Sequence, residues 1–180
     1  SSIVTGIRLI NTLDERIELL SKTGVDHLVV VPFTEYFANQ TAEEYIKYFL
    51  VEKFKPNTII IGYDHRFGKD RTGNYLLMVQ KAIEYNYTLK EIPEHLLDAV
   101  KVSSTTIRNA LLHGQIEEAN KLLGYAFFFT GQVVHGNKIG RTIGYPTANL
   151  KSHNEEKITL GDGIYAVYVT VVGKKYKGML

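Results

Sequence analysis

Apolar residues near the start of the chain recur at helical spacing and are followed by an uninterrupted apolar run. The helical spacing covers positions 13–20, where Asn11 or Thr12 can cap the predicted helix and Gly24 can end it. Residues 27–32 then form a short β-branched run that closes on a proline. Such a run is typical of a strand that is buried on both faces.

The same alternation of helical and strand patterns repeats along the following residues. Thr41 and Glu44 have the spacing of a capping box at the start of a helix. A second buried strand follows at 58–62, then a helix over about 74–85 and a strand near 88–92. Short links between strand, helix and strand favour right-handed crossovers and a parallel sheet. We therefore expect an α/β domain.

The pattern changes in the last third of the chain. A helix over 116–123 is followed by aromatic and β-branched runs at 127–129 and 164–172, which indicate strands. We therefore expect two domains, an α/β domain over 1–124 and a β domain over 125–180.

Composition and charge narrow the possible classes of function. The chain has 180 residues, 44% of them apolar, and a mean hydropathy of −0.10, as a soluble globular protein does. A net charge of +2 is too small to suggest a nucleic-acid partner. No apolar run approaches the roughly 20 residues that span a bilayer, and no signal-peptide pattern opens the chain, so we expect a cytoplasmic protein without a membrane partner. The absence of cysteine excludes disulfides and thiolate sites, and the six histidines never fall at metal-binding spacings.

The strongest candidate for ligand chemistry is the glycine-rich stretch 131–149. Its glycines stand at Gly131, Gly136, Gly140 and Gly144. They let the backbone bend repeatedly and lie close to a ligand. Lys138 and Arg141 place positive charge among them, and open backbone N–H groups together with cations bind phosphate oxygens. The stretch therefore predicts a polyphosphate loop.

The same stretch ends on Pro146, Thr147, Ala148 and Asn149. A hydroxyl and a carboxamide two residues apart are hard-oxygen donors of the kind that hold Mg²⁺ beside a nucleotide. The simpler alternative is a β-hairpin with a long glycine-rich turn and solvated basic side chains.

A second candidate follows the predicted strand at 58–62. Ligands of parallel sheets bind beyond the carboxyl ends of the strands, and residues 62–71 combine glycines, acids and bases at that position. The alternative is a loop whose acidic and basic side chains pair in solvent.

A third candidate is the start of the helix that Ser103 can cap. Free amides and the helix dipole favour an anion at such an end. Ser104 and Thr105 add hydroxyl donors, and Arg108, about one turn into the helix, could point back at the same phosphate. An ordinary capping motif would look the same.

These motifs resemble those of a known family. GQVVHGNKIGRTIGYPTAN at 131–149 resembles the signature of riboflavin kinases. GYDHRFG at 62–68 is similar to the G-x-D-F-x-F-G loop of prokaryotic FMN adenylyltransferases, with His65 in place of the usual aromatic residue. SSTTIR at 103–108 is similar to the phosphate-binding S-S-T-x-I-R motif of the same enzymes. Over nearly its whole length the chain thus resembles the prokaryotic bifunctional riboflavin kinase/FAD synthetases.

The resemblance implies a fold and a chemistry. The fold would be a Rossmann-like nucleotidyltransferase domain with an incomplete parallel sheet, followed by part of a Greek-key β-barrel riboflavin kinase domain. The kinase would phosphorylate riboflavin to FMN with ATP and Mg²⁺. The transferase would adenylylate FMN with a second ATP, giving FAD and pyrophosphate.

The resemblance also assigns roles to single residues. The transferase residues expected to bind nucleotide are Asp64, Phe67, Gly68, Ser103, Ser104, Thr105 and Arg108. Arg108 would also stabilise phosphate charge during the reaction. The kinase residues expected to bind nucleotide are Gly136, Lys138, Gly140, Arg141, Pro146 and Thr147. Thr147 and Asn149 would hold the metal, and Asn149 would have a catalytic role as well.

Two motifs of the family do not occur in the chain. One is the H-x-G-H of adenylyl transfer, and the other is the glutamate, beyond PTAN, that acts as the general base of the kinase. We therefore expect a chain truncated at both ends that has little activity by itself. The alternatives are an adenylyltransferase for another substrate fused to an unrelated β-domain, and a non-catalytic flavin or nucleotide sensor.

Overall fold

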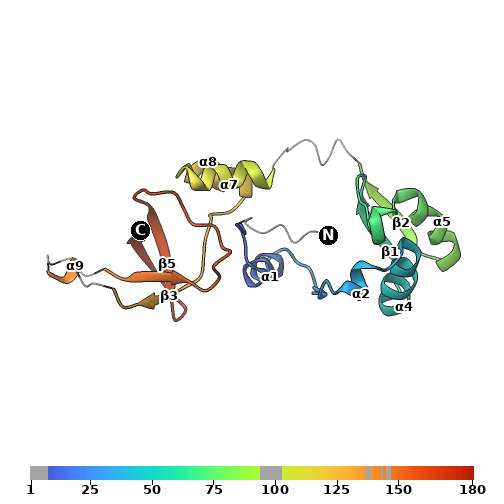
Figure 1. Ribbon diagram of the computed structural model, residues 1–180, viewed down its shortest axis with the longest axis horizontal. Coiled ribbons are helices and arrows are strands. Elements are labelled where there is room, and N and C mark those ends of the chain that lie inside the picture. Colours follow the sequence, from blue (N-terminus) through green and yellow to red (C-terminus); the bar gives the residue numbers. More distant parts are fainter. Residues whose placement is uncertain (1–7, 94–102, 137–138, 143, 145–146) are drawn as a thin grey trace. The chain divides into compact units, whose positions relative to one another are not determined.

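The chain folds into two compact units (Figure 1). The computed structural model describes residues 8–93, 103–136, 139–142, 144 and 147–180. Unit 1 comprises Ser1–Leu28 and Val102–Leu180, and unit 2 comprises Val29–Lys101. Each unit mixes helices with strands, so the protein is of the α/β type.

Unit 2 carries a two-stranded parallel sheet among helices. Its elements are α2 (Glu35–Ala38), α3 (Ala42–Glu44), η1 (Tyr45–Val51), α4 (Glu52–Phe54), β1 (Thr58–Gly62), η2 (Lys69–Arg71), α5 (Tyr75–Tyr85) and β2 (Thr88–Ile92). The register runs from Thr58 opposite Thr88 to Gly62 opposite Ile92. The parallel pairing expected from the sequence is thus confirmed for β1 and β2.

Short-range signals set the helix ends of unit 2. The Thr41 hydroxyl accepts from the Glu44 N–H at 3.2 Å, and the Glu44 carboxylate accepts from the Thr41 N–H at 2.8 Å. This is the predicted capping box, and it opens α3. Asn74 caps α5 in the same way, since its Oδ1 accepts from the Leu77 N–H at 3.0 Å.

The core of unit 2 lies between the sheet and the helices. Its buried members are Ala42, Ile46, Ile61, Phe67, Met78 and Tyr87. Tyr87 is only 6% exposed, and its hydroxyl donates to the Met78 carbonyl at 2.7 Å. Burial, followed by the charge of Tyr85, raises the pKa of Tyr87 to about 12.

The strand predicted at 27–32 does not form. The segment pairs with no strand in the described part of the chain, and Leu28, Val29 and Val30 are 46%, 53% and 50% exposed. The chain passes from unit 1 to unit 2 between Leu28 and Val29. A β-branched run becomes a buried strand only where a neighbour offers hydrogen bonds and cover, so local pattern alone gave a wrong prediction here.

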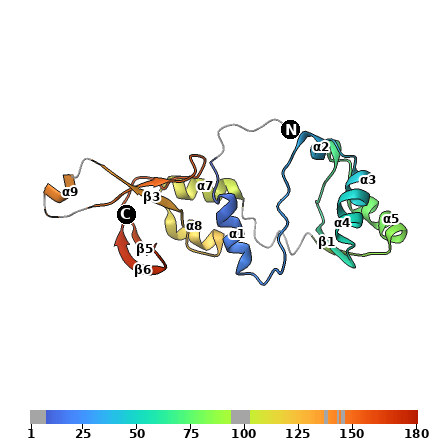
Figure 2. The same cartoon turned by 90° about the horizontal axis from the view of Figure 1, so that it is seen from below.

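In its described residues, unit 1 combines four helices with two antiparallel hairpins (Figure 2). Its elements are α1 (Leu13–Ser21), α7 (Ser104–Leu112), α8 (Ile116–Leu123), β3 (Gly131–Val134), the short α9 (Ile139–Thr142), β4 (Asn149–Ser152), β5 (Ala166–Val171) and β6 (Lys174–Met179). β3 pairs with β4, and β5 pairs with β6. Residues 127–129, expected to form a strand, lie outside the strands of the structure.

The core of unit 1 contains residues from the early and the late parts of its sequence. The buried members are Ile107, Ala110, Leu111, Ala119 and Ile158, and Ile10 and Phe127 pack against them. α8 ends at Gly124 in a left-handed conformation, as glycine allows. None of the helices in the described residues is long and apolar enough to cross a membrane.

Candidate functional site

The start of α7 presents the groups predicted for anion binding. Ser103 is the N-cap, and its hydroxyl accepts from the Thr106 N–H at 3.1 Å. Ser103, Ser104 and Thr105 are all exposed. The first amides of a helix lack partners within the helix, and the dipole favours negative charge there. The geometry therefore offers N–H and hydroxyl donors to a ligand.

Arg108 lies on the same helix but is held from outside it. Its Nε donates to the backbone carbonyl of Arg8 at 2.8 Å, and the side chain is half-buried. An arginine side chain carries further N–H donors on its terminal nitrogens. No other hydrogen bond of this side chain is found within the described residues. The guanidinium is thus anchored through Nε.

The glycine-rich stretch folds as a hairpin with a long loop. β3 and β4 pair with Val134 opposite Asn149, so Asn149 begins the returning strand. A side-chain carbon at Gly136 would lie 2.1 Å from the Asn149 Nδ2, so the carboxamide rests against bare backbone. Only glycine at position 136 leaves room for that contact.

The rest of this loop is open to solvent where it is described. Arg141, Thr147 and Asn149 are exposed, and Gly140 is half-exposed. The predicted site residues Lys138 and Pro146 lie outside the described residues. Within the described ranges, no group of three or more histidine and carboxylate side chains could hold a metal ion.

The loop after β1 is built into the core of unit 2. Phe67 is only 8% exposed, and its ring stacks on His65 at 5.5 Å and packs on Tyr45 at 5.4 Å. Gly68 has a φ of +72°, and a side chain there would collide with the Ala42 backbone at 2.6 Å. Asp64 is exposed. Phe67 and Gly68 thus shape the loop, and Asp64 is its predicted site residue that is exposed to solvent.

The structure brings together some of the predicted residues. Gly136 meets Asn149 across the hairpin, and Ser103, Ser104 and Thr105 are exposed together at the start of α7, while Ile107 of the same motif is buried in the core. These two groups belong to unit 1, whereas Asp64, Phe67 and Gly68 belong to unit 2.

Two features of unit 1 had no counterpart in the sequence-based prediction. One is the hydrogen bond between Arg108 and Arg8, which are distant in sequence and do not belong to a common motif. The other is a cavity of about 500 Å³ with a largely apolar lining that includes Phe129, Leu150, Ile158, Leu160, Tyr165 and Leu180. Its lining comes from several segments, so no local pattern predicts it.

Comparison with known protein families divides the chain into two matched stretches. Residues 5–106 match the model of the FAD synthetase family. Residues 123–180 match the model of the riboflavin kinase family.

Individual proteins give a consistent picture. A bifunctional riboflavin kinase/FMN adenylyltransferase of Buchnera aphidicola is 40% identical over 94% of this chain and 54% of its own length. The protein of the same name from Escherichia coli K12 is 36% identical over 91% of this chain and 51% of its own length. This chain therefore spans about half the length of the curated relatives it matches.

One solved structure shares the fold. It is a crystal structure described as a macrolide-efflux protein from Streptococcus pneumoniae, 35% identical in sequence, with a TM-score of 0.76. The match covers 94% of this chain and 54% of the pneumococcal chain.

Proposed function

Because the chain belongs to the FAD synthetase family and ends in a riboflavin kinase region, we propose that it takes part in making FAD from riboflavin. In the first reaction the 5′-hydroxyl of riboflavin attacks the γ-phosphorus of ATP and gives FMN and ADP. In the second, the phosphate of FMN attacks the α-phosphorus of another ATP and gives FAD and pyrophosphate. One observation carries the proposal. Each matched stretch contains its own exposed group of candidate phosphate-binding residues: the start of α7 in the FAD synthetase match, and the described part of the β3–β4 loop in the riboflavin kinase match.

Adenylyl transfer would use the start of α7. Ser103, Ser104 and Thr105 would donate to the departing pyrophosphate, and Arg108 would offset its charge. Asp64 would border the nucleotide from its loop, while Phe67 and Gly68 would hold that loop in shape. Phosphoryl-type chemistry depends on positioning and charge stabilisation, and these residues supply both.

Riboflavin phosphorylation would use the β3–β4 loop. Gly136 and Gly140 would admit the phosphates, Lys138 or Arg141 would offset the charge, and Pro146 would contribute to nucleotide binding. Thr147 and Asn149 would hold Mg²⁺. The argument that these two residues suit a metal ion rests on Gly136, because the absence of a side chain there leaves space for the Asn149 carboxamide beside the loop. When bound, the metal would neutralise charge on the phosphate oxygens.

The apolar cavity supports the flavin half of the proposal. Its volume of about 500 Å³ falls in the range of pockets that bury small organic ligands. Leu150, which lines it, directly follows Asn149 in β4. We assign this cavity to the flavin ring, and the two hairpins around it to the Greek-key barrel. We also propose that the boundary between the transferase and kinase regions lies near residue 124, where α8 ends, which is within compact unit 1.

Product analysis tests this function. The protein that carries this sequence should be incubated with ATP, Mg²⁺ and either riboflavin or FMN, and the flavins separated by chromatography. We expect FMN from riboflavin and FAD from FMN. Formation of neither product, with the protein folded and ATP present in excess, would overturn the proposal.

A further inference from the structure

A fully buried ion pair lies in unit 1, and its lysine is also one of the residues that line the cavity described above. Lys157 and Glu15 are 2% and 4% exposed, and their Nζ and Oε2 atoms are 2.5 Å apart. Glu15 is on α1, within the residues matched by the FAD synthetase family, and Lys157 is within the riboflavin kinase match. The pair therefore joins the two matched stretches.

Each member of the pair has further partners. The Lys157 Nζ also donates to the Ile10 carbonyl at 2.6 Å and lies 4.6 Å above the centre of the Phe127 ring. The Glu15 Oε2 also accepts from the Thr12 N–H at 2.9 Å, in the capping box of α1. A buried ion pair rarely adds much net stability, because desolvation opposes the attraction. Its best-attested role is to fix one register among alternatives.

Next to this ion pair, residues 8–10 pair with residues 155–158. Leu9 forms an isolated parallel bridge with Lys157. Its N–H donates to the Glu156 carbonyl at 2.7 Å, and its carbonyl accepts from the Ile158 N–H at 2.9 Å. The Arg8 guanidinium donates to the Glu155 carbonyl as well.

This pairing places the backbone carbonyl that holds Arg108. The Arg8 carbonyl, one residue before the bridge, accepts from the Arg108 Nε at 2.8 Å. A continuous path of contacts thus leads from Lys157 and Glu15 through Leu9 and Arg8 to Arg108. A shift of the 8–10 segment would move the guanidinium at the start of α7.

We propose that Lys157 and Glu15 form a positioning pair that sets the orientation of Arg108 and so the affinity of the α7 site for the pyrophosphate group. This inference rests on the proposed function of Arg108. It makes a residue of the riboflavin kinase region a determinant of binding at the transferase site.

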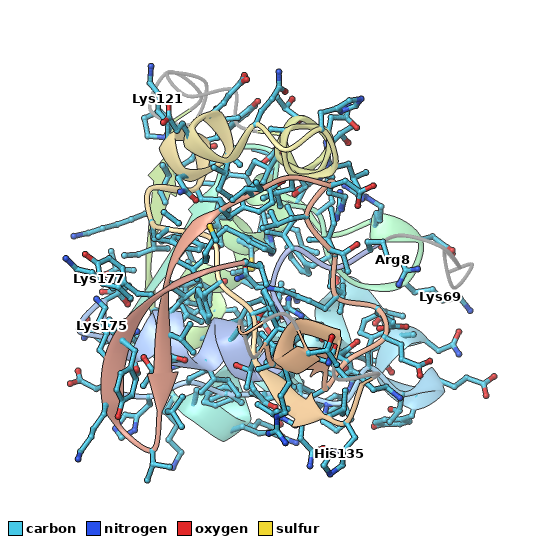
Figure 3. All side chains as sticks on the ribbon, turned by 90° about the vertical axis from the view of Figure 1, so that its left-hand side faces the viewer. Arg8, Lys69, Lys121, His135, Lys175 and Lys177 are labelled. Atoms are coloured by element: carbon cyan, nitrogen blue, oxygen red, sulfur yellow. The ribbon has the colours of Figure 1, made fainter. Side chains whose placement is uncertain are left out.

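The test is a double-mutant cycle read by calorimetric titration with inorganic pyrophosphate. Arg108→Ala first identifies the binding that belongs to α7. We expect Lys157→Met to weaken that binding about three- to tenfold. In the Arg108→Ala background, the same substitution should have no further effect. Lys121→Met, an exposed lysine on α8 (Figure 3), is the matched control and should leave the affinity unchanged.

The outcomes distinguish a failure of the proposed α7 site from a failure of the positioning role of Lys157 and Glu15. If Arg108→Ala does not weaken pyrophosphate binding, the proposed role of α7 fails. If Arg108→Ala weakens it but Lys157→Met does not, or if the two losses simply add, the positioning role is wrong. Should Lys157→Met not fold, as judged by far-UV circular dichroism, Glu15→Gln takes its place in the cycle. If neither variant folds, the pair serves folding itself and the inference is overturned.

Discussion

Tyr87 shows how a single hydroxyl ties a strand to a helix in unit 2. It begins the link into β2, and its only described hydrogen-bond acceptors are the carbonyl and the sulfur of Met78 on α5. Its pKa lies at about 12 in the folded protein, because burial disfavours the phenolate. The unfolded chain releases this proton near the ordinary value of about 10.

This difference makes stability depend on pH through Tyr87. The stabilisation is complete below pH 10 and is lost as the pH rises towards 12, because the unfolded state then binds fewer protons than the folded state. We expect the free energy of unfolding to fall over this window by up to about 1.4 kcal/mol per pH unit. Tyr87→Phe should remove this component and cost about 1 kcal/mol at neutral pH.

Urea unfolding followed by circular dichroism at pH 9.5 and 11.5 would measure the effect. Lysines also titrate in this range, so the quantity to compare is the difference between Tyr87→Phe and the unsubstituted protein. Tyr36→Phe is the control, because Tyr36 is 78% exposed. An unchanged pH dependence in Tyr87→Phe would contradict the assignment.

Residue types predicted local capping better than they predicted the orientation of side chains. Ser103 caps its helix, as the sequence had indicated. Phe67 was expected to border a nucleotide, but its ring lies in the core. An aromatic residue in a loop can turn towards solvent or towards the core, and the choice depends on partners such as Tyr45 that are distant in sequence. The hydrogen bond between Arg108 and Arg8 could not be predicted from the sequence for the same reason, since the two residues are distant in sequence.

At the scale of elements, α7 combines two roles in one residue. Ser103 satisfies the Thr106 N–H as a cap, and its exposed hydroxyl would also belong to the proposed anion site. Asparagine and aspartate cap helices about as well as serine does. The two roles can therefore be separated by substitution.

We expect Ser103→Asp to keep the stability of the protein and to weaken pyrophosphate binding, because a carboxylate repels the anion. Ser103→Asn, the neutral counterpart, should keep both properties within about twofold. Ser103→Ala should lower the free energy of unfolding by about 1 kcal/mol. Thermal unfolding and calorimetric titration measure the two quantities. Equal affinities for Ser103→Asp and Ser103→Asn would show that no anion binds at this helix end.

Elements defined by local signals were predictable, and elements defined by distant pairing were not. The capping box of Thr41 and Glu44 and the cap at Ser103 depend on residues three positions apart. β1 and β2 formed as expected, since each had the other as a partner. The run at 27–32 has equally strong strand character, but no strand of the described residues pairs with it.

At the scale of the whole molecule, the proposal is that two phosphate sites serve two reactions. One is the start of α7, near the end of the FAD synthetase match, and the other is the β3–β4 loop in the riboflavin kinase match. Separate sites should lose their functions separately. A shared site would lose both functions together.

The corresponding substitutions are Thr147→Ala and Arg108→Ala in the protein that carries this sequence. Thr147→Ala should lower FMN formation from riboflavin about 10²- to 10³-fold and leave FAD formation from supplied FMN largely intact, because it removes a metal ligand of one site only. Arg108→Ala should do the reverse, because the charge that it offsets develops on pyrophosphate. Initial rates of both reactions, each with its own flavin supplied, are the measurement. Thr170→Ala and Arg16→Ala, at exposed positions on β5 and α1, serve as controls. If either test substitution reduced both rates equally, the assignment of the two loops to separate reactions would be wrong.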